Sequence, residues 1–248
     1  MWNDDGFYTP GLGWIALRYI SYLALALVVV AIVGTCLQRV FPPKVPESVS
    51  PAGIRSGDLL FIGIPADYCG DNASMSSAIA DATSDSTSAV NFIHTAILDV
   101  DSTGTVWVID ATIAHGVDRH PLDTAFADFA LKDGRRAVFE VMRFENTKGA
   151  KWAAEQAYGY LGEEYDLYFL PGNGKHYCTE LVYDVYITFD GEHVFEQVPM
   201  NFLDPDGNMP AYWQKLFSRL GRPVPQGQPG TNPNQLHTHP HLQHVKYL

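Results

Sequence analysis

Apolar and polar positions along the chain predict an α+β domain that begins near residue 52. Short apolar runs bounded by Gly, Asp and Ser are typical of strands, whereas apolar positions three or four residues apart indicate helices. The grouping predicts an antiparallel sheet with helices packed against it. We expect strands at 57–64, 91–100, 105–113 and 135–144, and helices at 74–84, 121–131, 148–161, 178–189 and 209–221.

The N-terminal part follows a different pattern. The run "YISYLALALVVVAIVGTCL", from Tyr19 to Leu37, carries no charge over roughly 19 residues, about the length that spans a bilayer as a helix. A buried core helix is the alternative reading. We therefore expect an N-terminal segment at 1–18, a transmembrane or signal-anchor helix at 19–40, and a Pro-rich linker at 41–51.

This organisation predicts a protein of the cell envelope, anchored in the membrane by the N-terminal helix. The soluble domain is expected to be periplasmic or extracytoplasmic, although the few flanking basic residues leave the orientation open. A secreted effector is the alternative localisation. Oligomeric state is also left open by the sequence.

Composition narrows the classes of partner and cofactor. The 248 residues are 46% apolar, enough for a sizeable core, and their net charge of −12 includes no basic stripe. Binding to nucleic acid is therefore not expected. The cysteines, Cys36, Cys69 and Cys178, lie in unrelated segments, so they predict neither a disulfide framework nor a metal knuckle. We expect no cofactor and no metal.

The segment "GNGKHYCTELVY", residues 172–183, places Cys178 in the first turn of a predicted amphipathic helix. The partial positive charge at a helix N-terminus favours thiolate, which is the nucleophilic form of cysteine. Gly172 and Gly174 would let the loop approach a substrate closely. Burial as a small apolar residue is the alternative, since free cysteine is among the most buried residue types.

A hairpin upstream supplies a candidate base and its partner. If the turn is centred on Ser102, antiparallel pairing sets His94 directly opposite Asp110, with Cβ atoms about 5 Å apart. A carboxylate could then hold one imidazole nitrogen while the other faces a nucleophile. His176, two residues before Cys178, is a rival base, but its position ahead of the helix makes a direct approach to the cysteine unfavourable.

These motifs, in the order "GDLLF", "FIHTAI", "VWVIDA", "YDLYF" and "YCTELVY", resemble the circularly permuted NlpC/P60 cysteine hydrolases of the YiiX/YebB-like group. The resemblance covers residues 52–236 and implies a papain-like fold in which the histidine strand precedes the cysteine helix. It implies Cys178 as nucleophile, His94 as base and then acid, and Asp110 as the residue that orients the imidazole. In many relatives, the residue that orients the imidazole is glutamate. Aspartate is one methylene shorter, so the two strands must lie closer together for Asp110 to hydrogen-bond His94.

The same resemblance implies further site residues and a substrate. Tyr177 is a candidate for stabilising an oxyanion, together with the N–H of Cys178. Tyr165 and Asp166 are expected to line or brace the cleft. The implied reaction is hydrolysis of an amide through a thioester acyl-enzyme, in a peptidoglycan stem peptide, often at a γ-D-glutamyl bond to a diamino acid.

Other functions remain open on the same fold. A lipid acyltransferase or thioesterase would suit a membrane-anchored protein, and the apolar content of the cleft would distinguish it. An exported toxin that degrades cell walls would use the same chemistry as a housekeeping hydrolase. A non-catalytic, membrane-tethered binding module is the third alternative.

Two histidine-rich segments have plainer interpretations than metal binding. The tail at 237–248 contains His237, His239, His241 and His244 and is expected to lack a fixed scaffold. The segment "HGVDRH", residues 115–120, is interpreted as a polar turn after a strand, and "DPDGN", residues 204–208, as a turn too short for a calcium loop.

Overall fold

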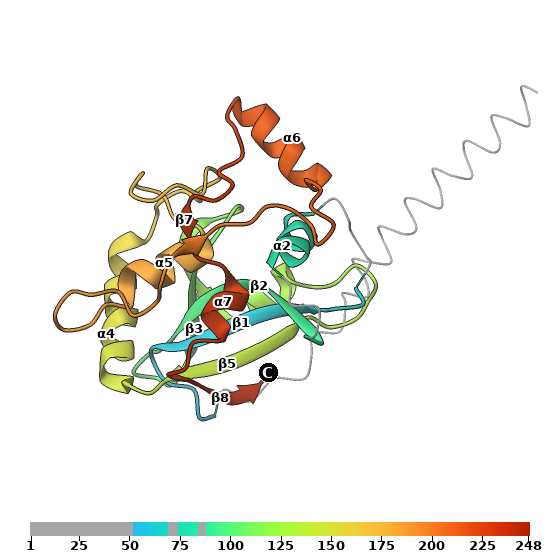
Figure 1. Cartoon of the computed structure of the whole chain (residues 1–248). Coiled ribbons are helices and arrows are strands. Elements are labelled where there is room, and N and C mark those ends of the chain that lie inside the picture. Colours follow the sequence, from blue (N-terminus) through green and yellow to red (C-terminus); the bar gives the residue numbers. More distant parts are fainter. Residues whose placement is uncertain (1–51, 69–73, 84–87) are drawn as a thin grey trace, which may run out of the picture. The chain divides into compact units, whose positions relative to one another are not determined.

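The computed structural model describes residues 52–68, 74–83 and 88–248, which belong to one unit spanning 50–248. The elements follow the expected α+β order (Figure 1). They are β1 Asp58–Pro65, α2 Met75–Thr83, β2 Val90–Val100, β3 Val106–Thr112, β4 Gly116–Pro121, α3 Leu122–Asp128, β5 Val138–Phe144, α4 Thr147–Ala157, the 3₁₀ turn η1 Tyr158–Tyr160, α5 Cys178–Val185, β6 Val198–Pro199, α6 Ala211–Leu220, β7 Pro229–Gly230, α7 Pro233–His237 and β8 Leu242–Tyr247.

An antiparallel sheet of six strands forms the centre of the described unit, in the order β4-β3-β2-β1-β5-β8. The apolar run of β1 is buried on both faces, because it lies in the interior of this sheet and hydrogen-bonds β2 and β5 on its two sides. A bulge in the β1–β2 ladder, between Ile62 and Gly63, shifts the pairing next to His94. Bulges re-aim side chains and are frequent beside active sites.

The helices bury the apolar stripes that their spacing predicts. Ala153 of α4, Leu181 of α5 and Leu236 of α7 join the main core with Leu59 and Phe61 of β1. Figure 1 shows α4 and α5 side by side, in agreement with their contacts. A separate apolar cluster forms where α6 packs against α2. Both clusters reach the start of α5, so Cys178 lies where they meet.

The histidine-rich tail differs from expectation, because it is part of the sheet. Residues Leu242–Tyr247 form β8, which pairs with β5. Glu140 of β5 is buried and hydrogen-bonds His237 at 3.1 Å and His244 at 2.7 Å. The prediction of a tail without a fixed scaffold was therefore wrong. Apolar and polar residues alternate only weakly in β8, and its partner Glu140 lies about a hundred residues earlier in the chain, so the local sequence does not indicate the pairing.

The predicted transmembrane or signal-anchor helix at 19–40, the linker at 41–51, Cys36 and Cys69 lie outside the described residues. Within the described ranges, no helix combines the length and the apolar character needed to cross a bilayer.

The docking of β8 gives a testable consequence for stability. Leu242 is 8% exposed and belongs to the main core, so replacing it with alanine should lower the free energy of unfolding by about 2–5 kcal/mol. Chemical denaturation followed by circular dichroism measures this. Tyr247→Ala, at a position 61% exposed, is the control and should change stability by no more than about 0.5 kcal/mol. Equal effects of the two substitutions would contradict a docked β8.

Candidate functional site

Cys178 is the first residue of α5, and only 5% of its surface is exposed. Tyr177 precedes it in extended conformation as the N-cap residue. The free N–H groups of the first helical turn therefore surround the sulfur, where their partial positive charge favours thiolate. Gly172 and Gly174 both adopt positive φ, of 71° and 74°, which explains why glycine occupies these two turns of the preceding loop.

His94 and Asp110 lie together, as the sequence predicts. His94 Nε2 donates a hydrogen bond to Asp110 Oδ2 at 2.6 Å, and the two side chains are 7% and 1% exposed. The negative charge of Cys178 raises the pKa of the same imidazole, so the sulfur lies near the ring. Because Nε2 is taken by Asp110, Nδ1 is the ring nitrogen that remains for the sulfur. The three groups are thus ordered as carboxylate, imidazole and sulfur.

The predicted hairpin register was wrong by two residues. Leu98 pairs with Val108 and Val100 with Val106, so the turn is centred on Thr103 instead of Ser102. The Asp101 carboxylate accepts hydrogen bonds from Thr103 N and Thr105 N, and Asp101 N donates to the Thr105 carbonyl oxygen. These bonds close the loop between Asp101 and Thr105. A shift of two residues keeps the same face of each strand, so His94 and Asp110 become diagonal neighbours that remain within reach.

His120 is a member of the site that the sequence reasoning missed. The segment interpreted as a polar turn forms β4, and Val108 pairs with His120. His120 Nε2 lies 3.0 Å from Asp110 Oδ1, and its Nδ1 lies 3.1 Å from the carbonyl oxygen of Pro121. Two acceptors face the ring, which suits an imidazolium. Burial lowers the pKa of His120, but the hydrogen bond and charge of Asp110 outweigh burial and raise it.

The signal that could have identified His120 is weak. The pattern of "HGVDRH" has too few apolar residues to indicate a strand, and the role of His120 becomes visible only from the pairing of β4 with β3. Sequence separation between Asp110 and His120 is short enough for a second hairpin, which is the one clue the chain offers.

The charges in the chain from Asp110 to Cys178 stabilise one another. Burial raises the pKa of Asp110, but hydrogen bonds from His120 and His94 reverse the effect and lower it to about 2. Burial lowers the pKa of His94, but the negative charge of Cys178 and the hydrogen bond to Asp110 raise it to about 10. At neutral pH the arrangement therefore favours an imidazolium at His94 beside the Asp110 carboxylate.

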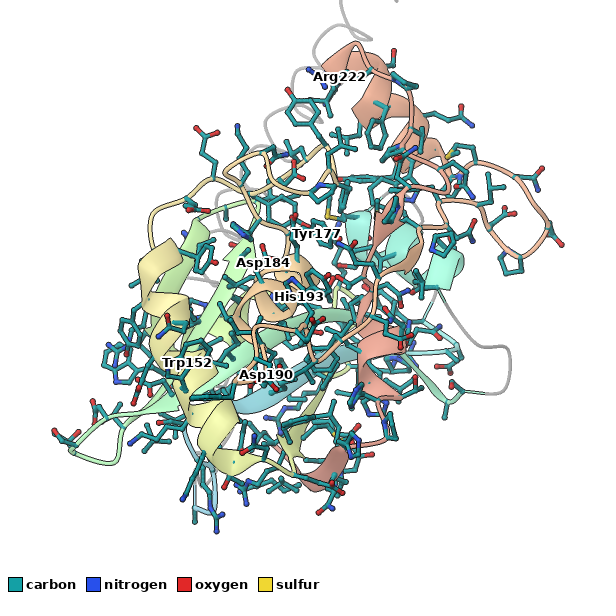
Figure 2. The ribbon with its side chains drawn as sticks, turned by 60° about the vertical axis from the view of Figure 1, so that its left-hand side comes forward. Trp152, Tyr177, Asp184, Asp190, His193 and Arg222 are labelled. Atoms are coloured by element: carbon teal, nitrogen blue, oxygen red, sulfur yellow. The ribbon has the colours of Figure 1, made fainter. Side chains whose placement is uncertain are left out.

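The rival base, His176, is held away from catalysis by other partners. Its Nδ1 lies 2.7 Å from Glu163 and its Nε2 lies 2.9 Å from Asp184, so both ring nitrogens are occupied. Figure 2 labels Asp184, which belongs to α5, and Tyr177, which precedes that helix. Burial raises the pKa of nearby Glu180 to about 8, so this carboxyl adds little negative charge to the first turn of α5 at neutral pH.

The tyrosines predicted near the oxyanion have different environments. Tyr177 is buried, and its hydroxyl oxygen accepts a hydrogen bond from Thr231 N at 3.1 Å. The Tyr165 hydroxyl donates only to the sulfur of Met75, at 3.7 Å, which is a weak acceptor. Burial raises the pKa of Tyr165, and the charge of Cys178 adds to the effect, so this phenol is neutral and lies close to the nucleophile.

Asp166 braces the loop that leads to α5. It is fully buried and accepts hydrogen bonds from Tyr168 N and Leu170 N, both at 2.8 Å. Between these two anchors, Phe169 adopts a left-handed backbone with φ of 52°, the only such non-glycine residue in the described part of the chain. The strained conformation points to a loop that is held firmly by its surroundings.

A cavity of about 50 Å³ opens beside Cys178. Its walls come from α2, the Asp166 loop, the segment before α6, α6 itself and the segment from β7 to α7. The lining residues are Ile79, Ala82, Thr83, Tyr165, Phe169, Tyr177, Cys178, Thr179, Met200, Asn201, Phe202, Trp213, Thr231, Asn232 and Pro233.

Comparisons with known proteins identify a matching family and a similar solved structure. A family model described as "Permuted papain-like amidase enzyme, YaeF/YiiX, C92 family" matches residues 54–246. Among solved structures, the chain is similar to metalloprotein yiiX from Escherichia coli O157:H7, with a TM-score of 0.58 and 28% sequence identity. That match covers 78% of this chain and 97% of the other. A comparison with curated proteins found no match.

The residues around Cys178 do not fit a metal ion. His94 and His120 both direct Nε2 at the carboxylate of Asp110, so these nitrogens already have partners. Across the ranges that the structure describes, no group of three or more His, Cys, Asp or Glu side chains is arranged to hold a metal. We assign no chemical step to one.

The polarised chain predicts how Cys178 responds to the loss of Asp110. In Asp110→Asn the imidazolium loses its carboxylate partner, so the pKa of His94 falls and less thiolate forms at low pH. Alkylation of Cys178 by iodoacetamide at pH 6 should slow by about tenfold or more, whereas the rates should converge near pH 10, where thiolate forms without the ion pair. Mass spectrometry of the Cys178 peptide separates this cysteine from Cys36 and Cys69.

Asp128→Asn is the matched control, because it removes the same charge from an exposed position in α3. It should leave the pH profile of alkylation unchanged. The Asp110 assignment fails if both variants behave like the wild type.

Proposed function

The chain belongs to the permuted papain-like amidase family of the YaeF/YiiX, C92 type, and on that premise we propose that it is a cysteine hydrolase that cleaves an amide bond. The observation that carries the proposal is the buried chain from Asp110 through His94 to Cys178. A nucleophile, a base and an orienting acid at these positions form a complete set for acyl transfer.

In the proposed reaction, the Cys178 thiolate attacks the carbonyl carbon of the amide and a C–S bond forms. The His94 imidazolium gives its proton to the amine nitrogen as the C–N bond breaks, which leaves a thioester. Neutral His94 then takes a proton from water, the resulting hydroxide attacks the thioester, and the C–S bond breaks to release the acid. Asp110 holds the imidazole in one orientation and remains ionised throughout.

The oxyanion needs donors on the far side of the carbonyl. We assign this role to the backbone N–H of Cys178 at the start of α5 and to the hydroxyl of Tyr165. The Tyr165 proton has only a thioether partner, so it is available to an oxyanion; the Tyr177 hydroxyl oxygen accepts from Thr231 N, which keeps Tyr177 as the second candidate donor. Asp166 contributes by fixing the loop that carries Tyr165.

We propose an amide of a peptidoglycan stem peptide as the substrate, in a cell-envelope setting with the N-terminal segment as the membrane anchor. The support is the resemblance of the motifs to cell-wall hydrolases and the uncharged run from Tyr19 to Leu37. A thioesterase or acyltransferase acting on an acyl chain is the second candidate, and the apolar lining of the cavity beside Cys178 favours it.

Digestion of purified peptidoglycan fragments tests the proposal, with products identified by mass. Wild-type protein should release stem-peptide fragments, and Cys178→Ala should release none. His94→Ala should lower the rate by a factor of about 10²–10⁴, as expected for loss of a general acid–base. His176→Gln, which removes the rival base, should retain activity within about tenfold of the wild type.

The outcomes separate the competing functions. Cleavage by Cys178→Ala at the wild-type rate would remove the assigned nucleophile. No cleavage by wild-type protein of any stem-peptide type, together with hydrolysis of acyl thioesters, would replace the first candidate with the second. Inertness towards both substrate classes would leave the non-catalytic binding module.

A further inference from the structure

The cavity beside Cys178 has mainly apolar walls, with Asn201, Thr231 and Asn232 among its polar lining residues. Ile79 of α2, Phe169, Met200 and Phe202 supply apolar surface, and Trp213 of α6 completes it. The aromatic rings pack edge to face, with Phe169 and Trp213 centroids 5.6 Å apart. Such a wall is fixed by its packing, so its shape is set before any ligand arrives.

No lining residue other than Cys178 carries a formal charge at neutral pH. None of the residues that line the cavity is Asp, Glu, Lys, Arg or His. A carboxylate or ammonium group placed here would lose its hydration without gaining an opposite charge, which is strongly unfavourable. The cavity therefore suits an uncharged group.

Its size limits the group further. A buried water occupies roughly 10–15 Å³ of cavity volume, so a cavity of about 50 Å³ holds about four waters. A side chain of three or four carbons fills that space, whereas a long acyl chain exceeds it. The apolar lining alone would accommodate a lipid, but the volume does not.

The position of His94 determines which part of the substrate enters. His94 protonates the leaving amine, so the amine side of the scissile bond lies towards His94. Neither His94 nor Asp110 lines the cavity, whereas Cys178 does. We therefore place the acyl part in the cavity, which Cys178 lines and His94 does not.

We infer that this cavity is an acyl-side specificity pocket for a small, uncharged aliphatic residue of a peptide. The inference rests on the proposed amide hydrolysis at Cys178 and names the substrate class for it. It favours a cleavage site after a residue such as alanine or valine over one after a γ-glutamyl residue, whose free carboxylate would be buried in the cavity.

A panel of aminomethylcoumarin amides tests the pocket in the wild-type protein. The acyl groups are N-acetylvalyl, isovaleryl, γ-glutamyl and hexadecanoyl. The N-acetylvalyl and isovaleryl amides, whose isopropyl group fits the cavity, should give the highest kcat/KM. The γ-glutamyl and hexadecanoyl amides should each fall by about tenfold or more, owing to charge and to length.

Substitutions in the wall assign these preferences to named residues. Trp213→Phe removes one ring of the aromatic wall and enlarges the cavity, so it should lower kcat/KM for the N-acetylvalyl and isovaleryl amides by a similar factor. Ile79→Ala enlarges the cavity and should raise activity on longer acyl groups relative to isovaleryl. Ile113→Ala, at a position 52% exposed outside the cavity, is the control. Thermal melting confirms that each variant is folded.

Binding to Cys178→Ala separates failure of the pocket from failure of the chemistry. Saturation-transfer NMR with the same amides should show contact of the valyl methyl groups with this variant. Preferential valyl binding without hydrolysis by wild type would retain the pocket and reject the amidase. Hydrolysis at rates independent of the acyl group, unchanged in Trp213→Phe and Ile79→Ala, would reject the pocket and retain the amidase.

Discussion

The site depends on one buried carboxylate and the two imidazoles that share it. Asp110 is 1% exposed, and an unpaired charge at that depth would be strongly unfavourable. His94 and His120 each engage one of its oxygens, from the neighbouring strands β2 and β4. Because β3 lies between these strands, sheet pairing itself brings the three side chains together. The orientation of His94 towards Cys178 is thus a consequence of how Asp110 is stabilised.

A second set of ionic contacts fixes the other half of the site. His176 bridges Glu163 and Asp184, and Asp166 holds the backbone that follows it. These contacts join the loop before α5 to the body of the helix, so Cys178 is held from both sides. The two histidines near Cys178 have different roles. His176, two residues before the nucleophile, is a structural cation, whereas the imidazole near the sulfur belongs to His94 of the distant strand β2.

Much of this arrangement could be predicted from the sequence, and the remainder has physical reasons for escaping prediction. The hairpin and the cysteine helix follow from local alternation and helical spacing, so His94, Asp110 and Cys178 were identified together. The β2–β3 register differed from the predicted one because the Asp101 side chain fixes the shape of the turn. The alternation of apolar and polar residues carries no information about such a bond. His120 and β8 depend on long-range pairing of strands with weak patterns. Cavity size follows from packing among five separate segments, and no linear pattern reports it.

The pocket and the catalytic residues share Cys178 and are otherwise built from different residues. Tyr177 forms part of the cavity wall, and Cys178 follows it as the nucleophile. The β6–β7 pair packs against Tyr177 at Gly230, where a side-chain carbon would collide with Met200 and the Tyr177 hydroxyl. That close approach narrows the cavity without touching His94 or Asp110. Changes in the wall could therefore alter which acyl group enters while the charges that activate the sulfur stay in place.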